Sequence, residues 1–195
     1  MRMVRTPNLF APAAIGRRAF LRRLAAAGVG VAAARGAWAA EGESRTVSFL
    51  HTHTGEQLTA NYYADGAYCA GVLQQVNVLL RDFRNDTVFP IDPAVLDRLY
   101  ALQTVTGGSE PFQVISGYRS AATNAALREK SSGVAEHSLH MDGRAIDVRL
   151  TGVASDRLAL LARLQSSGGV GFYRVSDFVH LDTGRVRIWG DSIAG

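Results

Sequence analysis

The second half of the chain consists of short apolar segments separated by glycine-bearing loops, and this arrangement limits the possible folds more than any other feature. Segments of four to six residues suit β-strands and are too short for most helices. We expect strands at 112–116, 145–150, 170–173, 178–182 and 186–189. Two helices, at 121–130 and 156–164, are predicted between these strands.

A hairpin and two further helices are predicted earlier in the chain. Residues 46–50 and 58–63 alternate between apolar and polar side chains on either side of a turn at Thr54-Gly55-Glu56. Apolar residues at helical spacing follow at 68–83, and Asp92-Pro93 is typical of the start of a second helix. Helices that precede a largely antiparallel sheet indicate an α+β fold, in which the helices pack on one face of a small, mostly antiparallel sheet.

Residues 1–40 differ in composition from the rest of the chain. They contain seven arginines, no acidic residue and a run rich in alanine, glycine and valine. Arg17-Arg18 precedes an apolar run at 24–34, and Ala37-Trp38-Ala39 offers the small residues at which a signal peptidase cuts. This pattern predicts a twin-arginine export signal at 1–40, one folded domain at 41–195 and a periplasmic location.

The alternative for the arginine-rich segment is a retained membrane anchor. Its apolar run is shorter than the roughly 20 residues that a spanning helix needs, so we expect cleavage and no stable membrane span afterwards. Removing the seven arginines from the 21 basic residues leaves 14, against 17 acidic residues, and the remaining net charge is near −3. Such a domain is not expected to bind nucleic acid, and its length suits a single core. We expect a monomer.

The densest group of potential metal ligands lies between Glu136 and Asp147. His140 is predicted in a loop, and Asp147 follows seven residues later near the start of a strand. The small residues Gly143 and Ala145 between them allow the chain to turn back tightly, so that the imidazole and the carboxylate can converge. Asp147 has apolar neighbours in its strand, where a carboxylate needs a partner such as a cation.

A third candidate ligand, His180, lies in the apolar segment 178–182. His180 and Asp182 share one face of this predicted strand. Asp182 is a candidate either for orienting a ligand through a hydrogen bond or for accepting the amides of the following turn. Two histidines and one carboxylate leave the fourth position of tetrahedral zinc open to water, as in catalytic sites. The residues therefore indicate a catalytic zinc site at His140, Asp147 and His180.

These residues resemble a known motif. Ser138-x-His140-x-x-Gly143-x-Ala145-x-Asp147 and the later His180 are similar to the zinc D-alanyl-D-alanine carboxypeptidases, whose superfamily includes lysostaphin-type enzymes and the hedgehog fold. Further segments resemble the murein endopeptidase K-like branch of that superfamily, and together they cover nearly all of 41–195. They are Ser116-Gly117-Tyr118-Arg119-Ser120, Ser132-Gly133-Val134-Ala135, Gly168-Gly169-Val170-Gly171-Phe172-Tyr173 and Phe178-Val179-His180-Leu181-Asp182-Thr183-Gly184.

The resemblance implies a function and a ligand set. His140, Asp147 and His180 would bind Zn²⁺, and the domain would hydrolyse peptide cross-links of peptidoglycan. Arg119 would stabilise bound substrate near the metal, because a guanidinium can hold a carboxylate or a developing oxyanion; a loop-stabilising salt bridge is the alternative. A D,D- or L,D-carboxypeptidase that trims stem peptides is a rival activity. A zinc-bearing domain that binds the wall without cutting it is a rival of another class.

The general base is less constrained by the sequence. Relatives in this superfamily use either a carboxylate three residues before the last ligand or a histidine two residues before it, and these positions are Asp177 and Phe178 here. Asp177 is therefore the leading candidate to take a proton from water and pass it to the leaving amine. The alternatives are that Asp177 is an exposed turn residue, and that His137 is the base, a neighbour of a ligand or simply exposed.

Two further groups of residues are weaker candidates. His51 and His53 would share one strand face, but no third ligand is near them in sequence, so a polar hairpin end is the better interpretation. Three aromatic residues are candidates either for the walls of a peptide groove or for the core. They are Tyr118, Phe172 and Trp189.

Overall fold

The structure, a computed structural model, describes residues 43–131 and 133–193. The predicted export signal at 1–40 lies outside these residues. Glu41–Gly195 forms a compact unit. Within its described residues, no helix has both the length and the apolar character needed to cross a membrane.

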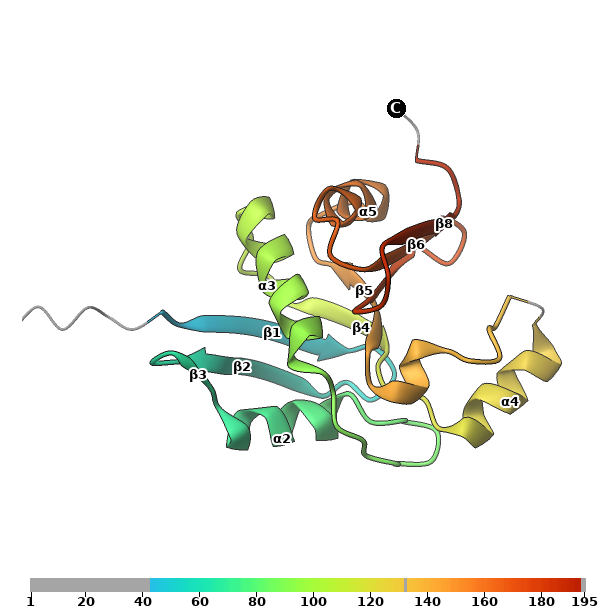
Figure 1. Cartoon of the computed structure of the whole chain (residues 1–195), viewed down its shortest axis with the longest axis horizontal. Coiled ribbons are helices and arrows are strands. Elements are labelled where there is room, and N and C mark those ends of the chain that lie inside the picture. The colour runs from blue at the N-terminus through green and yellow to red at the C-terminus, as the bar shows by residue number, and fades with distance from the viewer. Residues whose placement is uncertain (1–42, 132, 194–195) are drawn as a thin grey trace, which may run out of the picture. The chain divides into compact units, whose positions relative to one another are not determined.

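An eight-stranded sheet forms the frame of this unit (Figure 1). Its strands lie in the order β3-β2-β1-β4-β5-β7-β6-β8. They are β1 (Arg45–His51), β2 (Gln57–Ala64), β3 (Ala67–Tyr68), β4 (Phe112–Ser116), β5 (Ala145–Leu150), β6 (Gly169–Tyr173), β7 (Phe178–Asp182) and β8 (Arg187–Gly190). Among the described strands, β1 pairs with β4 and β6 pairs with β8 in parallel, and the other five pairs are antiparallel. The prediction of a mostly antiparallel sheet is confirmed.

Four α-helices and one 3₁₀ helix accompany the sheet in the described part of the chain. They are α2 (Ala70–Leu79), α3 (Pro93–Thr106), α4 (Ala121–Lys130), α5 (Ser155–Leu164) and the 3₁₀ helix η1 (Leu139–Asp142). α3 packs against β1, α5 packs against β5, β6 and β7, and the two helices contact each other, whereas α4 lies apart from them (Figure 1). The α+β prediction is therefore confirmed.

Local sequence chemistry explains where α3 begins and ends. The carboxylate of Asp92 accepts a hydrogen bond from the amide of Ala94 at 3.0 Å and so caps the helix. Pro93 occupies the first turn, where its missing amide hydrogen costs nothing. The helix ends at Gly107, whose φ of 69° suits glycine.

The predicted helix at 68–83 begins too early. Asp65 and Gly66 have φ angles of 52° and 81°, which is the conformation of a two-residue hairpin turn. This turn brings Tyr68 opposite Tyr63 in an additional short strand, β3. The helix can begin only after that strand ends.

The same predicted helix also extends too far. α2 ends at Leu79, and the amide of Asp82 donates to the carbonyl of Thr87 at 3.0 Å. The buried carboxylate of Asp82 accepts hydrogen bonds from the amide of Ser120 at 3.0 Å and from its hydroxyl at 2.7 Å. These long-range bonds to the start of α4 take the place of a further helical turn.

Strand alternation separates a core face of the sheet from a polar face. Ile146, Val148 and Leu150 of β5 are buried in one hydrophobic core that includes Leu99 of α3 and Leu158 of α5. The residues between them in β5 point the opposite way. The ligand candidates of β5 and β7 therefore lie on the sheet face that α3 and α5 do not cover.

Candidate metal centre

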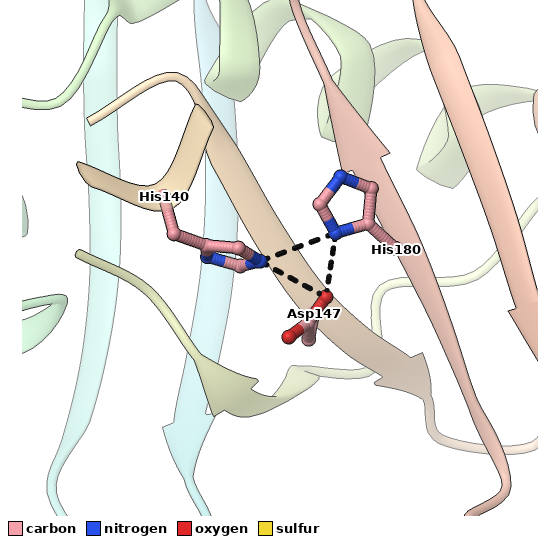
Figure 2. A group of neighbouring side chains, drawn as sticks. All are labelled: His140, Asp147 and His180. Atoms are coloured by element: carbon pink, nitrogen blue, oxygen red, sulfur yellow. Dashed lines mark hydrogen bonds and ion pairs between the residues drawn. The ribbon is translucent and has the colours of Figure 1, made fainter. Parts of the chain in front are cut away.

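His140, Asp147 and His180 converge on one point (Figure 2). They come from η1, β5 and β7, respectively. Asp147 Oδ1 lies 3.2 Å from His140 Nε2 and 2.9 Å from His180 Nδ1, and the two nitrogens are 3.1 Å apart. All three residues are buried, and they are the one group of three potential metal ligands in the part of the chain that the structure describes.

The backbone sets this convergence. Asp147 and His180 are direct partners in the antiparallel β5–β7 ladder, which brings their side chains together on one face. Ser138 caps η1 by accepting from the amide of His140 at 3.4 Å. Gly143 ends η1 with a φ of 65°, and a Cβ there would lie only 2.0 Å from the carbonyl oxygen of Pro90. The predicted role of Gly143 in a tight turn is therefore met.

A carbonyl partner fixes the tautomer of the His140 imidazole, and both ring nitrogens of His180 face carboxylates. His140 Nδ1 lies 2.7 Å from the carbonyl oxygen of Gly117. Since a carbonyl only accepts, Nδ1 carries the hydrogen and Nε2 presents a lone pair. His180 Nε2 lies 3.1 Å from the Oδ2 atom of Asp182, and its Nδ1 lies 2.9 Å from the Oδ1 atom of Asp147. The neutral tautomer that donates to Asp182 presents its Nδ1 lone pair toward Asp147 and His140. In that tautomer three acceptors, including Asp147 Oδ1, face one another, and this arrangement is repulsive unless a cation lies among them.

The pKa shifts of the three residues also indicate that a positive charge is favoured among them. Burial alone would raise the pKa of Asp147, but the neighbouring His140 and His180 hold that pKa well below its usual range. Burial lowers the pKa of His140 against the attraction of Asp147. In His180, hydrogen bonds to Asp147 and Asp182 outweigh burial and raise the pKa. A buried carboxylate between two imidazoles requires a proton or a metal ion as its partner.

The donor set fits zinc. Two imidazole nitrogens and one carboxylate oxygen form one of the ligand sets that proteins use for a catalytic zinc ion, with a fourth position left open. Ligand atoms about 2.0–2.1 Å from a tetrahedral zinc lie roughly 3.4 Å apart, close to the separations of 2.9–3.2 Å found here. The side chains need little movement to accept the ion.

The centre opens onto a cavity of about 440 Å³. The cavity is also lined by Arg119, His137, Tyr173, Phe178, Arg187 and Trp189. Of the aromatic groove candidates, Trp189 lines this cavity, Phe172 is buried in the core, and Tyr118 stacks on Phe89 at 4.7 Å. A larger hollow of about 740 Å³ lies over β2 and α2 and contains none of the predicted site residues.

Arg119 lies beside the ligand group. Its Nη2 is 3.7 Å from Asp147 Oδ2, and its side chain is only 12% exposed. Its Nη1 donates to Asn124 Oδ1 at 3.4 Å, and its backbone amide donates to the carbonyl of His140 at 3.1 Å. The guanidinium therefore faces the cavity from a position that the loop and α4 hold in place.

Asp177 lies away from this group. It adopts a φ of 51° in the turn between β6 and β7, and its carboxylate is 64% exposed and lies 3.4 Å from Arg149 Nε. The flanking Ser176 and Phe178 line the cavity, as does the exposed His137. Of the two candidates for the general base, the structure brings His137 to the cavity wall.

His51 and His53 have structural contacts. His51 is fully buried, and its Nδ1 accepts hydrogen bonds from the amides of His53 at 3.3 Å and Thr54 at 3.4 Å. The ring of His53 stacks on Phe83 at 4.2 Å. These contacts agree with the interpretation of this pair as the polar end of a hairpin.

Two residues contribute to the site without having been predicted to do so. The Gly117 carbonyl orients His140, and Arg187 lies 2.7 Å from the carboxylate of Asp182. No sequence signal marks one backbone carbonyl as the partner of a histidine. The contribution of Arg187 could be found only by knowing that β8 runs beside β6.

Comparisons with known proteins identify related sequences. The family described as peptidoglycan L,D-endopeptidase MepK matches residues 39–189. Peptidoglycan L,D-endopeptidase MepK of Escherichia coli (strain K12) is 41% identical over 145 residues, which cover 74% of this chain and 80% of that protein. A probable peptidoglycan L,D-endopeptidase MepK of Haemophilus influenzae is 39% identical over 146 residues, covering 74% and 78%.

A solved structure, the L-Ala D-Glu endopeptidase ChiX of Serratia marcescens, shows a partial likeness. It is 20% identical, with a TM-score of 0.32, over 48% of this chain and 68% of that one.

The α+β domain, its buried ligand group and the sequence matches define the class of this protein as a peptidase that acts on peptidoglycan. The chain belongs to the peptidoglycan L,D-endopeptidase MepK family. The resemblance to the murein endopeptidase K-like branch is thereby confirmed.

Proposed function

We propose that this chain is a zinc-dependent endopeptidase that hydrolyses L,D peptide cross-links of peptidoglycan, such as those between two diaminopimelate residues. The observation that carries the proposal is the convergence of His140 Nε2, Asp147 Oδ1 and His180 Nδ1 at the cavity. The names of the MepK relatives support this substrate.

The chain's own residues prepare the site for the ion. The Gly117 carbonyl holds the hydrogen of His140 on the far side of the ring, and Asp182 is placed to hold that of His180 in the same way once a metal takes the Nδ1 lone pair. A zinc ion bound there would supply Lewis-acid chemistry, which polarises a scissile carbonyl and lowers the pKa of a water molecule. Burial excludes bulk water from the ligands and strengthens these interactions.

Arg119 is proposed to bind the substrate. Its guanidinium lies next to Asp147 and lines the same cavity. A peptide carboxylate, or the oxyanion that develops on the scissile carbonyl, would be held there by charge-assisted hydrogen bonds. The contact to Asn124 keeps the guanidinium from turning away.

Two residues remain candidates for the proton acceptor. His137 lines the cavity, which supports its assignment. Asp177 occupies the position that the family resemblance assigns to the base, but its carboxylate would first have to leave its ion pair with Arg149.

Export to the periplasm is part of the proposal. It rests on Arg17-Arg18, the following apolar run and the small residues at 37–39. The family match begins at residue 39 and so leaves the arginine-rich segment outside the matched region. Folding before transport would suit the twin-arginine route.

Digestion of purified peptidoglycan by residues 41–195 tests the proposal. We expect loss of cross-linked muropeptides by mass spectrometry, inhibition by a chelator and recovery with added zinc. Cleavage that persists after metal removal would contradict the mechanism. Release of terminal D-alanine with cross-links intact would instead show a carboxypeptidase, and zinc binding without any cleavage would favour a wall-binding domain.

A further inference from the structure

Arg187 forms a two-pronged ion pair with the carboxylate next to the candidate metal centre. Its Nη2 lies 2.7 Å from Asp182 Oδ2, and its Nη1 lies 3.0 Å from Oδ1. Asp182 is fully buried and also accepts from the amides of Gly169 at 3.1 Å and Gly184 at 2.8 Å. Its Oδ2 faces His180 Nε2 at 3.1 Å. Each oxygen of this carboxylate thus contacts at least two nitrogen atoms.

The surrounding backbone leaves room for this pair. A Cβ on Gly169 would lie 2.4 Å from Asp182 Oδ2 and 2.6 Å from Arg187 Nη1. A Cβ on Gly184 would lie 3.0 Å from Asp182 Oδ1 and 3.2 Å from Arg187 Nη1. Two glycines are therefore packed against the same ion pair, and a larger residue at either position would collide with it.

Arg187 also contacts a second neighbour of His180. Its guanidinium lies 4.7 Å from the ring centre of Trp189, and Trp189 lies 5.1 Å from the imidazole of His180. The indole covers Gly171, where a Cβ would lie 2.6 Å from the ring. His180 is consequently held on two sides, by a carboxylate and by an indole, and Arg187 touches both.

We propose that Arg187 is a positioning residue of the metal centre, which holds Asp182 so that the His180 Nδ1 atom stays directed at the ion. This inference rests on the proposed function, in which His180 is a zinc ligand. A carboxylate that orients a ligand histidine contributes to metal affinity, and the planar fork of arginine fixes both carboxylate oxygens at once. Without the fork, the amides of Gly169 and Gly184 still hold Oδ1, but Oδ2 keeps only its contact with His180. The Oδ2 atom can then shift and carry the imidazole out of line.

Arg187 also lines the cavity, and its side chain is 35% exposed. Direct binding of substrate is therefore the competing role. The structure favours positioning because both terminal nitrogens are already engaged by Asp182. The two roles differ in a measurable way, since only a positioning residue changes the affinity for zinc alone.

The experiment compares Arg187→Met, Arg187→Lys and the control Arg185→Met in residues 41–195, a compact unit with its own core. Arg185→Met removes the same charge two positions away at an exposed residue. Zinc dissociation constants are measured by competition with a chromophoric chelator, and folding by far-ultraviolet circular dichroism. We expect Arg187→Met to weaken zinc binding by roughly 10- to 100-fold, Arg187→Lys to weaken it less, and Arg185→Met to stay within about twofold of wild type.

The outcomes separate this inference from the proposed function. A folded Arg187→Met protein that binds zinc as tightly as wild type, with a raised KM for muropeptides, would show substrate binding and overturn the positioning role. If Arg187→Met does not fold, wild-type zinc affinity in Arg187→Lys would overturn it equally, because a lysine cannot hold both oxygens. A wild-type domain that fails to bind zinc would overturn the proposed function itself.

Discussion

The carboxylate of Asp147 and the imidazole of His180 face each other across the β5–β7 ladder, with 2.9 Å between Oδ1 and Nδ1. Because both residues lie on neighbouring strands of one sheet, strand spacing sets their separation. His140 reaches the same point from η1, where a hydrogen bond to the Gly117 carbonyl orients its ring. The centre thus combines two candidate ligands on rigid strands with one candidate ligand on a short helix.

Zinc is expected to stabilise the folded domain through this group. At a free zinc concentration 100 times the dissociation constant, binding adds about 2.7 kcal/mol to the free energy of unfolding. Asp147→Asn should abolish this increment, because a neutral amide replaces the one negatively charged ligand of the group. Urea unfolding with zinc and with chelator measures it. Asp142→Asn, at an exposed carboxylate of η1, should retain the increment; its loss there would contradict a site-specific effect.

The general base can be identified by paired substitutions. We expect Asp177→Asn to keep kcat within about threefold of wild type, and His137→Gln to lower it by roughly 10²-fold or more, because of these two candidates it is His137 that lines the cavity. Asparagine tolerates the left-handed backbone at position 177, so a loss of activity there would not reflect misfolding. A large loss in Asp177→Asn with little change in His137→Gln would restore Asp177 as the base.

His51 should make the domain sensitive to acid. Burial, assisted by the charge of His53, lowers the pKa of His51 to about 4, from 6.5. The unfolded chain therefore binds a proton between these values that the folded chain does not, and stability falls as pH drops from 6.5 to 4. The loss is roughly 1–3 kcal/mol.

Chemical unfolding across that pH range checks this expectation. In His51→Asn the side-chain oxygen can still accept from the amides of His53 and Thr54, but it does not titrate. This part of the pH slope should then disappear, while acid unfolding caused by the carboxylates remains. An unchanged slope between pH 6.5 and 4 would show that His51 is not the responsible group.

Gly117 should tolerate no side chain. A Cβ there would lie 2.5 Å from the carbonyl oxygen of Leu80 and 2.8 Å from its Cβ. Gly117→Ala must therefore displace the carbonyl that orients His140, which we expect to cost about 1–3 kcal/mol of stability and to weaken zinc binding. Gly71→Ala serves as the control, because nothing lies within 4 Å of a Cβ at that helical position. Equal stability and zinc affinity in both variants would contradict the role of Gly117.

Much of the fold could be predicted from local patterns. The strands at 112–116, 145–150 and 178–182 and the helix at 121–130 have the predicted bounds, because alternation, helical spacing and caps act over a few residues. The helix at 68–83 was predicted too long because periodicity alone ignores the Asp65-Gly66 turn and the distant hydrogen bonds of Asp82.

The sequence by itself determined which residues offer metal-binding chemistry: a histidine before a tight turn, an aspartate in an apolar strand and a histidine in another. Only the tertiary structure decided that Gly117 and Asp182 orient the two imidazoles, that Arg187 holds Asp182, and that His137 lines the cavity while Asp177 pairs with Arg149. The physical reason is range. Residue type is a local property, whereas these contacts depend on strand register and on packing between segments far apart in the chain.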